Sequence, residues 1–319
     1  MLSLRTIVSN TLLIVDGHNI CIRAYFGLVR QQLRTKDGVG TWGLYGSINT
    51  LTSQVKKYNP THIAVTMDWG KSSKRTALYP EYKANRTSNG QDENYQESRE
   101  QVRLFREFCK LSNIPVIRFE NVEADDIMAK LVKTYHSDFD KIVILTADHD
   151  IRQLIDEKVI VVKPSLGQSR DIEEQTFDLQ SIVDNYGIKP NRLPEIWALT
   201  GDRGDNVPGV PSIGEKTAMK LLTEFGSLSN LLMSDHKKIN EHKEIARLSY
   251  KLVQLDGLDD LDIPSLDRLE FKPVRIGKVG SGSFLDFIEK YELNSIKSRW
   301  LVDELWDEER PIGRRLSDG

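Results

Sequence analysis

The chain has 319 residues, of which 39% are hydrophobic and 29% charged, so it can bury a full core and hold two domains or one elaborated domain. No apolar stretch approaches the ~18 residues of a membrane helix, residues 1–10 lack the apolar core of a signal peptide, and two cysteines give no disulfide framework. We therefore expect a cytoplasmic protein. The net charge of −3 argues against a bulk nucleic-acid coat but leaves room for local basic patches.

Short runs rich in Val and Ile alternate with helix-length segments, which predicts an α/β fold with a mostly parallel central sheet flanked by helices. Three of these runs end in aspartate: residues 12–15 lead into Asp16, residues 63–67 into Asp68 and residues 142–147 into Asp148. Ligands of parallel sheets bind outside the carboxyl ends of the strands. We therefore expect these carboxylates to collect at the edge where chemistry takes place.

The segments between these runs fit such a domain until residue 69. Apolar residues with helical spacing predict a helix from Gly40 to Tyr58. From Trp69 to Arg99 the pattern breaks into a polar segment, and residues 71–86 carry five basic residues against one acid. A loop of this length in a compact domain is usually functional or disordered. Helical spacing resumes at residues 102–108, and short strands are predicted at residues 114–119 and 159–162.

Further acids follow in three segments. Glu123, Asp125 and Asp126 open a predicted helix, Asp150 comes two residues after Asp148, and Asp202 and Asp205 stand at a helix end. A lone Asp at a strand end commonly caps a turn, and adjacent acids commonly start a solvated helix. The same feature in five segments favours a site for two divalent cations, because oxygen ligands suit Mg²⁺ or Mn²⁺. Such a pair activates water in phosphodiester cleavage.

Beyond about residue 176 the chain is predicted to be helical. A compact turn, Gly209 to Gly214, separates helices at 193–199 and 216–225. It resembles a P-loop, but Glu215 intervenes before Lys216, so a nucleotide-triphosphate site is rejected. Two interpretations remain open: a clamp in which backbone N–H groups and Lys216 hold a phosphate backbone, or a plain packing turn.

The segment from Tyr79 to Arg86 mixes bases with tyrosines, which suits a nucleic-acid strand but also a mobile charged loop. Residues 259–278 are predicted to be irregular and residues 284–291 to form one more helix. The charged tail at residues 307–319 lacks periodicity and is predicted to be disordered.

Taken together, five motifs resemble the 5′-nuclease family, which includes flap endonucleases, bacteriophage 5′–3′ exonucleases and the N-terminal domain of bacterial DNA polymerase I. The segment at 200–218 is similar to the family's helix–three-turn–helix signature. The other matching segments lie at 16–19, 82–86, 122–126 and 145–154. They follow the family's order over residues 11–260. His149 stands where Lys is common and Gly204 where Ser is common, and neither departure removes an acid.

The resemblance implies a PIN-like nuclease core at residues 1–175, with a helical arch at about 70–106 whose span proper is 87–106. It implies a duplex-DNA-binding helical region at 176–270, then a C-terminal helix and disordered tail at 271–319. The implied protein is a stand-alone, monomeric 5′–3′ exonuclease and flap endonuclease of bacterial or phage type. It would remove RNA primers and 5′ flaps in replication and repair, acting on DNA flaps, nicks or ends and on RNA/DNA hybrids. A single-strand-binding protein or a polymerase would be a partner.

The resemblance also assigns residues. One metal would be held by Asp16, Asp68, Glu123 and Asp125, and the second held or surrounded by Asp126, Asp148, Asp150, Asp202 and Asp205. Mg²⁺ would be the ion, with Mn²⁺ as a substitute; the acid that bridges the two metals stays open. Lys83 and Arg86 would contact the scissile phosphate, and Tyr82 would stack on a frayed base. Duplex contacts, with a K⁺ ion in the turn, would come from Gly209, Val210, Ser212, Ile213, Gly214, Lys216 and Thr217.

Two other functions are weighed against this one. A single-strand ribonuclease with a related acidic core would have no need for the duplex clamp at 201–217. A non-catalytic branched-DNA-binding protein would tolerate a depleted acid set, whereas all nine acids are present here.

Overall fold

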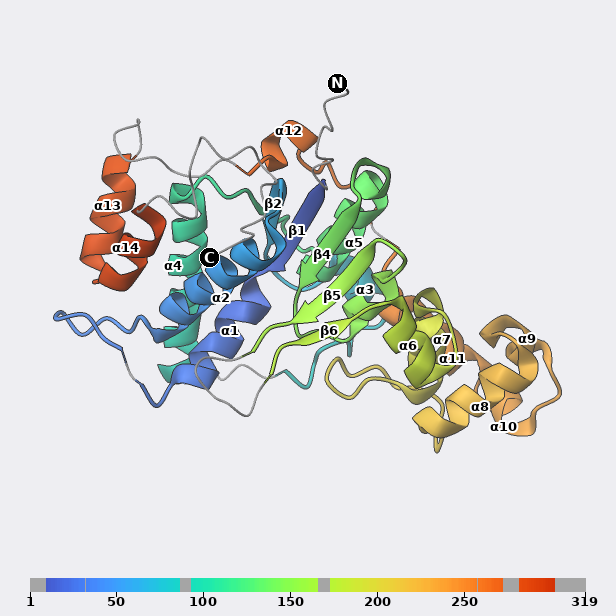
Figure 1. Cartoon of the computed structure of the whole chain (residues 1–319). Coiled ribbons are helices and arrows are strands. Elements are labelled where there is room, and N and C mark those ends of the chain that lie inside the picture. The colour runs from blue at the N-terminus through green and yellow to red at the C-terminus, as the bar shows by residue number, and fades with distance from the viewer. Residues whose placement is uncertain are drawn as a thin grey trace, which may run out of the picture.

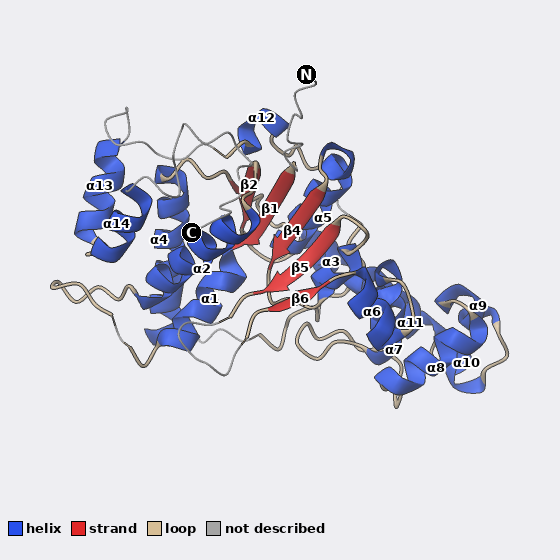
Figure 2. Cartoon of the chain, viewed as in Figure 1, coloured by secondary structure: helices blue, strands red, loops and turns tan. Residues whose placement is uncertain are grey.

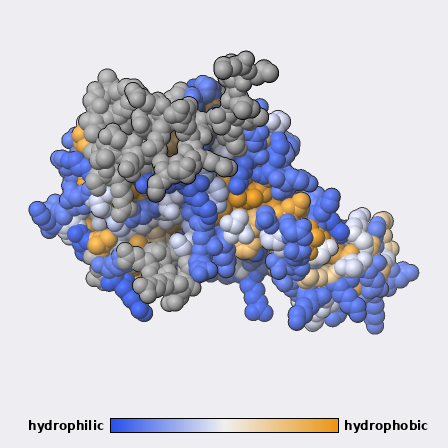
Figure 3. Space-filling model, in the orientation of Figure 1, coloured by the Kyte–Doolittle hydropathy of each residue, from blue (hydrophilic) through white to orange (hydrophobic). Residues whose placement is uncertain are grey.

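The computed structural model describes residues 10–31, 33–86, 93–165, 173–256, 258–271 and 281–301. An α/β part with a central sheet carries a second, helical part that extends from one side (Figure 1). Among the described helices, none is both long and apolar enough to cross a membrane. The face drawn in Figure 3 is mainly hydrophilic, with hydrophobic residues gathered near the middle of the view, over the sheet.

The sheet has six strands in the order β3-β2-β1-β4-β5-β6, and all neighbours are parallel except the last pair, β5 and β6 (Figure 2). From β1 the strands follow one another outward to β3, and from β4 they follow one another outward on the other side to β6. The strand order therefore reverses between the neighbouring strands β1 and β4. The strands are β1 (Thr11–Asp16), β2 (His62–Thr66), β3 (Val116–Ile117), β4 (Lys141–Leu145), β5 (Val159–Lys163) and β6 (Gln175–Phe177).

Both faces of the sheet are buried, which explains why its strands read as continuous apolar runs. Along β1, Leu12 and Ile14 enter one hydrophobic cluster, whereas Leu13 and Val15 enter the other. The register pairs Asp16 with Thr66 of β2 and Val15 with Leu145 of β4. Strands β1, β2 and β4 therefore end at the same edge, as the sequence predicts.

One face of the sheet is covered by helices that include α4, which spans most of the predicted arch at 87–106. The two cysteines, Cys21 and Cys109, are fully buried in this layer, and burial raises the pKa of the Cys21 thiol to about 12. Phe108 of α4 also packs on Phe284, with ring centroids 5.8 Å apart. The helices of this layer are α1 (Gly17–Leu28), α2 (Trp42–Tyr58), α4 (Glu93–Leu111), α13 (Ser281–Lys290) and α14 (Asn294–Leu301).

The opposite face packs on α5 and on the helical part of the chain, and these share one continuous hydrophobic cluster. The elements here are α3 (Ser73–Leu78), α5 (Ala124–Tyr135), α6 (Leu179–Tyr186), α7 (Leu193–Thr200), α8 (Glu215–Phe225), α9 (Leu228–Met233), α10 (Lys237–Glu241), α11 (Lys243–Val253) and α12 (Leu266–Leu269). Single 3₁₀ turns lie at His136–Asp138, Asp150–Leu154 and Pro190–Arg192.

Two sequence predictions need correction, those for the polar segment and for the C-terminal region. Strand β6 pairs with β5 and belongs to the sheet, and the predicted domain border at 175/176 falls inside this strand. The polar segment is not a continuous loop: it contains α3, which Ser72 caps through its hydroxyl, and α4 already begins at Glu93. The C-terminal region has two helices instead of one. The first residues of the predicted arch, 87–92, and the whole of the predicted tail, 307–319, lie outside the described residues.

Candidate metal centre and nucleic-acid interface

The ends of three parallel strands bring the first acids together. Asp16, at the end of β1, is only 4% exposed. Its Oδ1 accepts a hydrogen bond from the Asn19 backbone N–H (3.0 Å), which caps α1, and its Oδ2 accepts one from the Thr146 hydroxyl (2.8 Å). Thr146 belongs to the segment that follows β4 and leads into Asp148. The position of Asp16 is therefore fixed from two strands.

The start of α5 adds two more carboxylates. Glu123 is the N-cap residue of α5, and Asp125 lies in the first turn. The backbone N–H of Ala124 donates to Oδ1 of Asp68 at 2.8 Å, which ties the helix start to the end of β2. Helix N-termini favour negative charge, so the helix dipole stabilises this arrangement.

Electrostatic crowding shows which acids share one space. Burial, followed by the charges of Asp68 and Asp148, raises the pKa of Asp16 to about 7. Desolvation, followed by Asp148, Asp16 and Asp68, raises the pKa of Asp125 well above its usual value. Like charges brought together in this way must protonate or bind cations. Asp16, Asp68, Asp125 and Asp148 thus form one acidic group, which we call the inner group.

A second set of acids lies on the other side of Asp148. Burial, followed by Asp148, Asp202 and Asp205, raises the pKa of Asp150 well above its usual value. These four residues form the outer group. Asp148 belongs to both groups, and the sequence did not indicate which acid lies between them.

The donor chemistry of both groups fits divalent cations. Every donor is a carboxylate oxygen, the ligand that hard cations prefer. Oδ1 of Asp150 is buried and accepts no hydrogen bond from the described residues, although His149 Nε2 lies 3.2 Å away. A bound cation would satisfy this oxygen. The side chains of Asp148, His149 and Asp150 each offer a ligand atom within 4.8 Å of the others, so the His149 ring lies at the acidic cluster.

Asp126 differs from the prediction that it holds or surrounds a metal. Its Oδ1 and Oδ2 accept hydrogen bonds from the two terminal nitrogens of Arg75, at 2.9 and 2.6 Å, and both residues are buried. The carboxylate is therefore paired with α3 through Arg75, which also contacts Glu123. Adjacent residues of a helix point about 100° apart, which is why Asp125 and Asp126 have different partners.

Lys83 joins the two sides of the site. Its ammonium lies 2.7 Å from Oε1 of Glu123 and 3.3 Å from Oδ2 of Asp205. Burial alone would lower the pKa of Lys83, but the charges of Glu123 and Asp205 outweigh it and raise the pKa. Its backbone is left-handed (φ 55°), an uncommon conformation for a non-glycine residue. The Lys83 ammonium therefore lies beside the carboxylates.

Tyr82, which is predicted to stack on a frayed base, lies inside the protein in this structure. Its side chain is 3% exposed, and its hydroxyl donates towards Glu123 (3.1 Å) and Asp205 (3.0 Å). The Lys83 ammonium lies 5.0 Å from the ring centroid. The tyrosine therefore orders acids and a cation from within the protein.

The base of the arch is docked on the loop that carries Asp202 and Asp205. Arg86 forms an ion pair with Asp205, the Asn85 amide donates to the Arg203 carbonyl (2.6 Å), and the Asn206 amide donates to the Glu81 carbonyl (2.7 Å). Sequence reasoning missed both asparagines. No local pattern marks them, because their partners are about 120 residues away.

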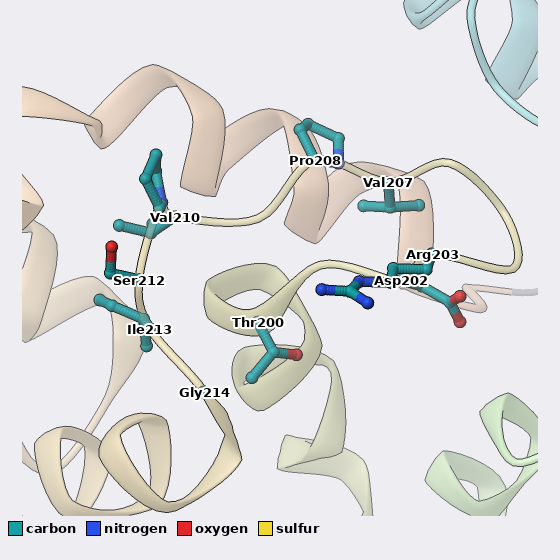
Figure 4. A pocket seen from close by; sticks show the side chains of 10 residues that line it. Thr200, Asp202, Arg203, Val207, Pro208, Val210, Ser212, Ile213 and Gly214 are labelled. Atoms are coloured by element: carbon teal, nitrogen blue, oxygen red, sulfur yellow. The ribbon is translucent and has the colours of Figure 1, made fainter.

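The compact turn after α7 encloses a pocket of about 440 Å³. In Figure 4 the Thr200 hydroxyl and the Arg203 guanidinium point into the space between the two loop segments, whereas the side chains of Ser212 and Ile213 point away from that space on the far side of the turn. The carboxylate of Asp202 points away from this space. A basic and hydroxyl-bearing pocket of this kind suits an anionic ligand.

Not all of the predicted backbone donors are free. The N–H groups of Gly209, Val210 and Ile213 donate to Ser249 Oγ (3.2 Å), the Leu199 carbonyl (2.7 Å) and the Val210 carbonyl (3.2 Å). Within the described chain no such acceptor is found for the N–H groups of Ser212 and Gly214, both exposed. The first turn of α8, with exposed Lys216 and Thr217, has no side-chain cap. The donors to an outside anion are therefore Ser212, Gly214 and the start of α8.

Comparison with known proteins gives the family. Residues 11–187 match the 5′-3′ exonuclease N-terminal resolvase-like domain, and residues 188–276 match the 5′-3′ exonuclease C-terminal SAM fold. The chain is 34% identical over 257 residues to a 5′-3′ exonuclease of Aquifex aeolicus, covering 79% of this chain and 83% of that protein. It is 35% identical over 301 residues to DNA polymerase I of Caldicellulosiruptor bescii, covering 92% of this chain and 34% of the polymerase.

Solved structures share the fold. The T5 5′-exonuclease with bound zinc aligns with a TM-score of 0.66 at 24% identity, covering 88% of this chain and 99% of that chain. The bacteriophage T5 flap endonuclease in a pseudo-enzyme-product complex with DNA and metal ions aligns with a TM-score of 0.66 at 23% identity, covering 89% of this chain and 100% of that chain.

The acidic edge of the sheet lies beside Lys83 and Arg86. The nearby turn carries N–H groups, at Ser212 and Gly214, that have no acceptor in the described chain. Together these features indicate a nuclease. Within that class, the chain belongs to the 5′-3′ exonuclease family. The predicted family, the predicted fold class and the predicted 5′-nuclease function are confirmed. The border between the two family domains, at 187/188, also lies beyond the one predicted from the sequence.

Proposed function

We propose that this nuclease depends on two divalent cations, Mg²⁺ in the cell with Mn²⁺ as a substitute, and that it acts as both a 5′–3′ exonuclease and a flap endonuclease. The observation that carries the proposal is the pair of acidic groups that share Asp148 at the carboxyl edge of the sheet. In this proposal Asp148 is the acid between the two cations. The biological task of the nuclease would be the removal of RNA primers and 5′ flaps during replication and repair.

The duplex part of the substrate would dock on the helix–three-turn–helix. The N–H groups of Ser212 and Gly214, the N-terminus of α8 and the Lys216 ammonium would hold backbone phosphates, which fixes register without reading sequence. A K⁺ ion in this turn is part of the same proposal. The relatives crystallised with DNA are consistent with this role.

Bound cations would supply Lewis-acid chemistry, lowering the pKa of water and neutralising charge on the scissile phosphate. The inner group would hold one cation with Glu123, and the outer group would hold the other. Lys83, already paired with Glu123 and Asp205, has an ammonium that can contact the phosphate from the arch side. Hydrolysis would add water at phosphorus, release a 3′-hydroxyl and leave a 5′-phosphate.

End-labelled flap, nicked and single-stranded substrates test this function, each incubated with Mg²⁺ or with a chelator. We expect Mg²⁺-dependent cleavage near the base of the flap and no cleavage with the chelator. Absence of Mg²⁺-dependent cleavage on all three substrates would remove the proposal.

The metal-free protein is expected to lose stability as the pH rises from about 4 to about 7. The pKa of Asp16 is raised from 3.8 to about 7, so the folded state holds this proton longer than the unfolded state does. Over this pH range, a shift of about three pKa units lowers the free energy of unfolding by an amount of the order of 4 kcal/mol. Mg²⁺ relieves this repulsion, so it should raise the melting temperature more at pH 8 than at pH 5.5. Scanning fluorimetry at both pH values measures this, and equal shifts would contradict it.

The asparagine variant of the same residue is the control for this measurement. Asp16→Asn cannot ionise, so its melting temperature should depend less on pH, and Mg²⁺ should shift it less than it shifts the unmodified protein.

Removing the positive charge of Lys216 from the duplex clamp should weaken duplex binding and reduce the dependence of that binding on salt. Lys216 is exposed at the start of α8. Because a phosphate contact releases about one counterion, Lys216→Ala should reduce the slope of log K against log salt by about 1, equally for unrelated sequences. Fluorescence anisotropy with a chelator measures this. Lys110→Ala is the matched control, because exposed Lys110 ends α4 at the opposite edge of the sheet and its slope should not change.

A further inference from the structure

Helix α11 lies between the duplex clamp and the acidic groups, and hydrogen bonds in its C-terminal half fasten it to both sides. Its buried face consists of Ala246, Ser249, Leu252 and Val253, and it packs against α7, which leads into the clamp. In Figure 1, α7 and α11 lie side by side where the helical part joins the α/β part. The sequence gives no sign of this role, because α11 carries none of the predicted site residues.

On the clamp side, α11 is joined to the turn through Ser249. The Ser249 hydroxyl is fully buried and accepts a hydrogen bond from the Gly209 backbone N–H at 3.2 Å. Gly209 has φ +64°, and a Cβ there would lie 2.3 Å from the Gly201 nitrogen. This point of the clamp therefore cannot shift on its own, and its position is passed directly to α11.

On the other side, Arg75 joins α11 to Glu123 and Asp126 at the start of α5, beside the inner group. Its Nε donates to the Leu252 carbonyl at 2.9 Å. The same guanidinium holds Glu123 at 3.1 Å and both carboxylate oxygens of Asp126. One buried side chain thus spans α3, α5 and the last turn of α11.

Gln153 makes a second connection on that side, to the outer group. Its amide nitrogen donates to the carbonyls of Asp150 (2.9 Å) and Val253 (3.0 Å), and its amide oxygen accepts from the Leu255 N–H (2.8 Å). All three hydrogen bonds join Gln153 to backbone atoms of the protein, and its side chain is buried. Helix α11 is therefore joined to the outer group by Gln153, and to the start of α5 beside the inner group by Arg75.

We propose that α11 is a strut that sets the distance between the duplex clamp and the acidic groups, and thereby the nucleotide at which the strand is cut. Ser249 and Val253 are four residues apart, about 6 Å along a rigid helix. Successive nucleotides of a strand are about 3.4 Å apart along the duplex, so a small movement on either side changes which phosphate reaches the acids. Arg75, Gln153 and Ser249 are positioning residues in this proposal, which rests on the proposed flap-endonuclease function.

The test measures where the strand is cut, a property that a general loss of stability does not change. Gln153→Met keeps an unbranched side chain but removes all three hydrogen bonds, and Ser249→Ala removes the clamp connection. Ser47→Ala is the matched control, because Ser47 is equally buried, in α2, and donates to the Gly43 carbonyl at 2.6 Å. Each variant is incubated with Mg²⁺ and an end-labelled flap, and products are resolved at single-nucleotide resolution.

We expect the unmodified protein and Ser47→Ala to share one dominant cut position. Gln153→Met and Ser249→Ala should raise the fraction of cuts displaced by one or more nucleotides by about threefold, since misplacement of the order of 1 Å changes rates strongly. Duplex affinity, measured by anisotropy with a chelator, should stay within about twofold, because the clamp's own donors are intact.

Slower cleavage at an unchanged position in both strut variants would overturn the proposal, as would the same broadening in Ser47→Ala. If Gln153→Met does not melt cooperatively, Ser249→Ala alone decides the outcome. Failure of the unmodified protein to cleave any flap would instead remove the proposed function, and the strut's role with it.

Discussion

Asp148→Asn is expected to lower the rate of flap cleavage by about 10³-fold or more, because a metal ligand is worth several kcal/mol of transition-state stabilisation and each 1.36 kcal/mol is a factor of ten. Asp148 is the acid that both groups share, since its charge raises the pKa of Asp16, of Asp125 and of Asp150. Its loss therefore weakens the binding of both proposed cations. Single-turnover cleavage of a labelled flap with Mg²⁺ measures the change.

DNA binding separates a metal role from a DNA-contact role. Affinity for the flap substrate, measured with a chelator, should be unchanged or higher in Asp148→Asn, because one negative charge near the phosphates is removed. Asp184→Asn is the matched control, since Asp184 is exposed on α6 and accepts a hydrogen bond from Gln180 only within its own helix. Cleavage by Asp148→Asn at the unmodified rate would refute the assignment of Asp148 to the metal centre.

Asp126→Ala is expected to lower the free energy of unfolding by about 3–5 kcal/mol, the usual effect of removing one partner from a buried ion pair. The cost arises because the Arg75 guanidinium stays buried after both of its hydrogen bonds to Asp126 are lost. Urea unfolding followed by circular dichroism measures it. Asp256→Ala is the control: the Lys74–Asp256 pair is about half exposed, so its loss should change the free energy by less than about 1 kcal/mol.

The same variant decides between the two roles considered for Asp126. If Asp126 is structural, Mg²⁺ should still raise the melting temperature of Asp126→Ala by as much as in the unmodified protein. Normal stability combined with loss of the Mg²⁺-induced shift would instead show that Asp126 binds metal, as the family resemblance implied.

The strand-end acids could be predicted from the sequence because their positions depend on local rules. A buried parallel strand is a run of four to six apolar residues, and its carboxyl end lies at a known edge of the sheet. Asp16, Asp68 and Asp148 therefore had to meet. The clamp turn could be located for a similar reason, since its glycines and the helix start after it are neighbours in the chain.

The partner of each side chain could not be predicted, because partners are set by packing between distant segments. Asp125 and Asp126 are adjacent and chemically identical, yet only Asp126 meets a guanidinium, and that guanidinium belongs to a residue about 50 positions earlier. Tyr82 is drawn into the interior by two acids from separate segments. The edge strand β6 is only three residues long, too short to give a periodic signal.

The buried thiols of the α1–α4 layer give the molecule an internal reporter. Thiol reagents attack the thiolate, and neither Cys21 nor Cys109 ionises or meets solvent while the layer is closed. Labelling of the native protein therefore counts the events in which α1 and α4 separate from the sheet. Because α4 spans most of the predicted arch, the rate of labelling with and without DNA measures how substrate changes the motion of this layer.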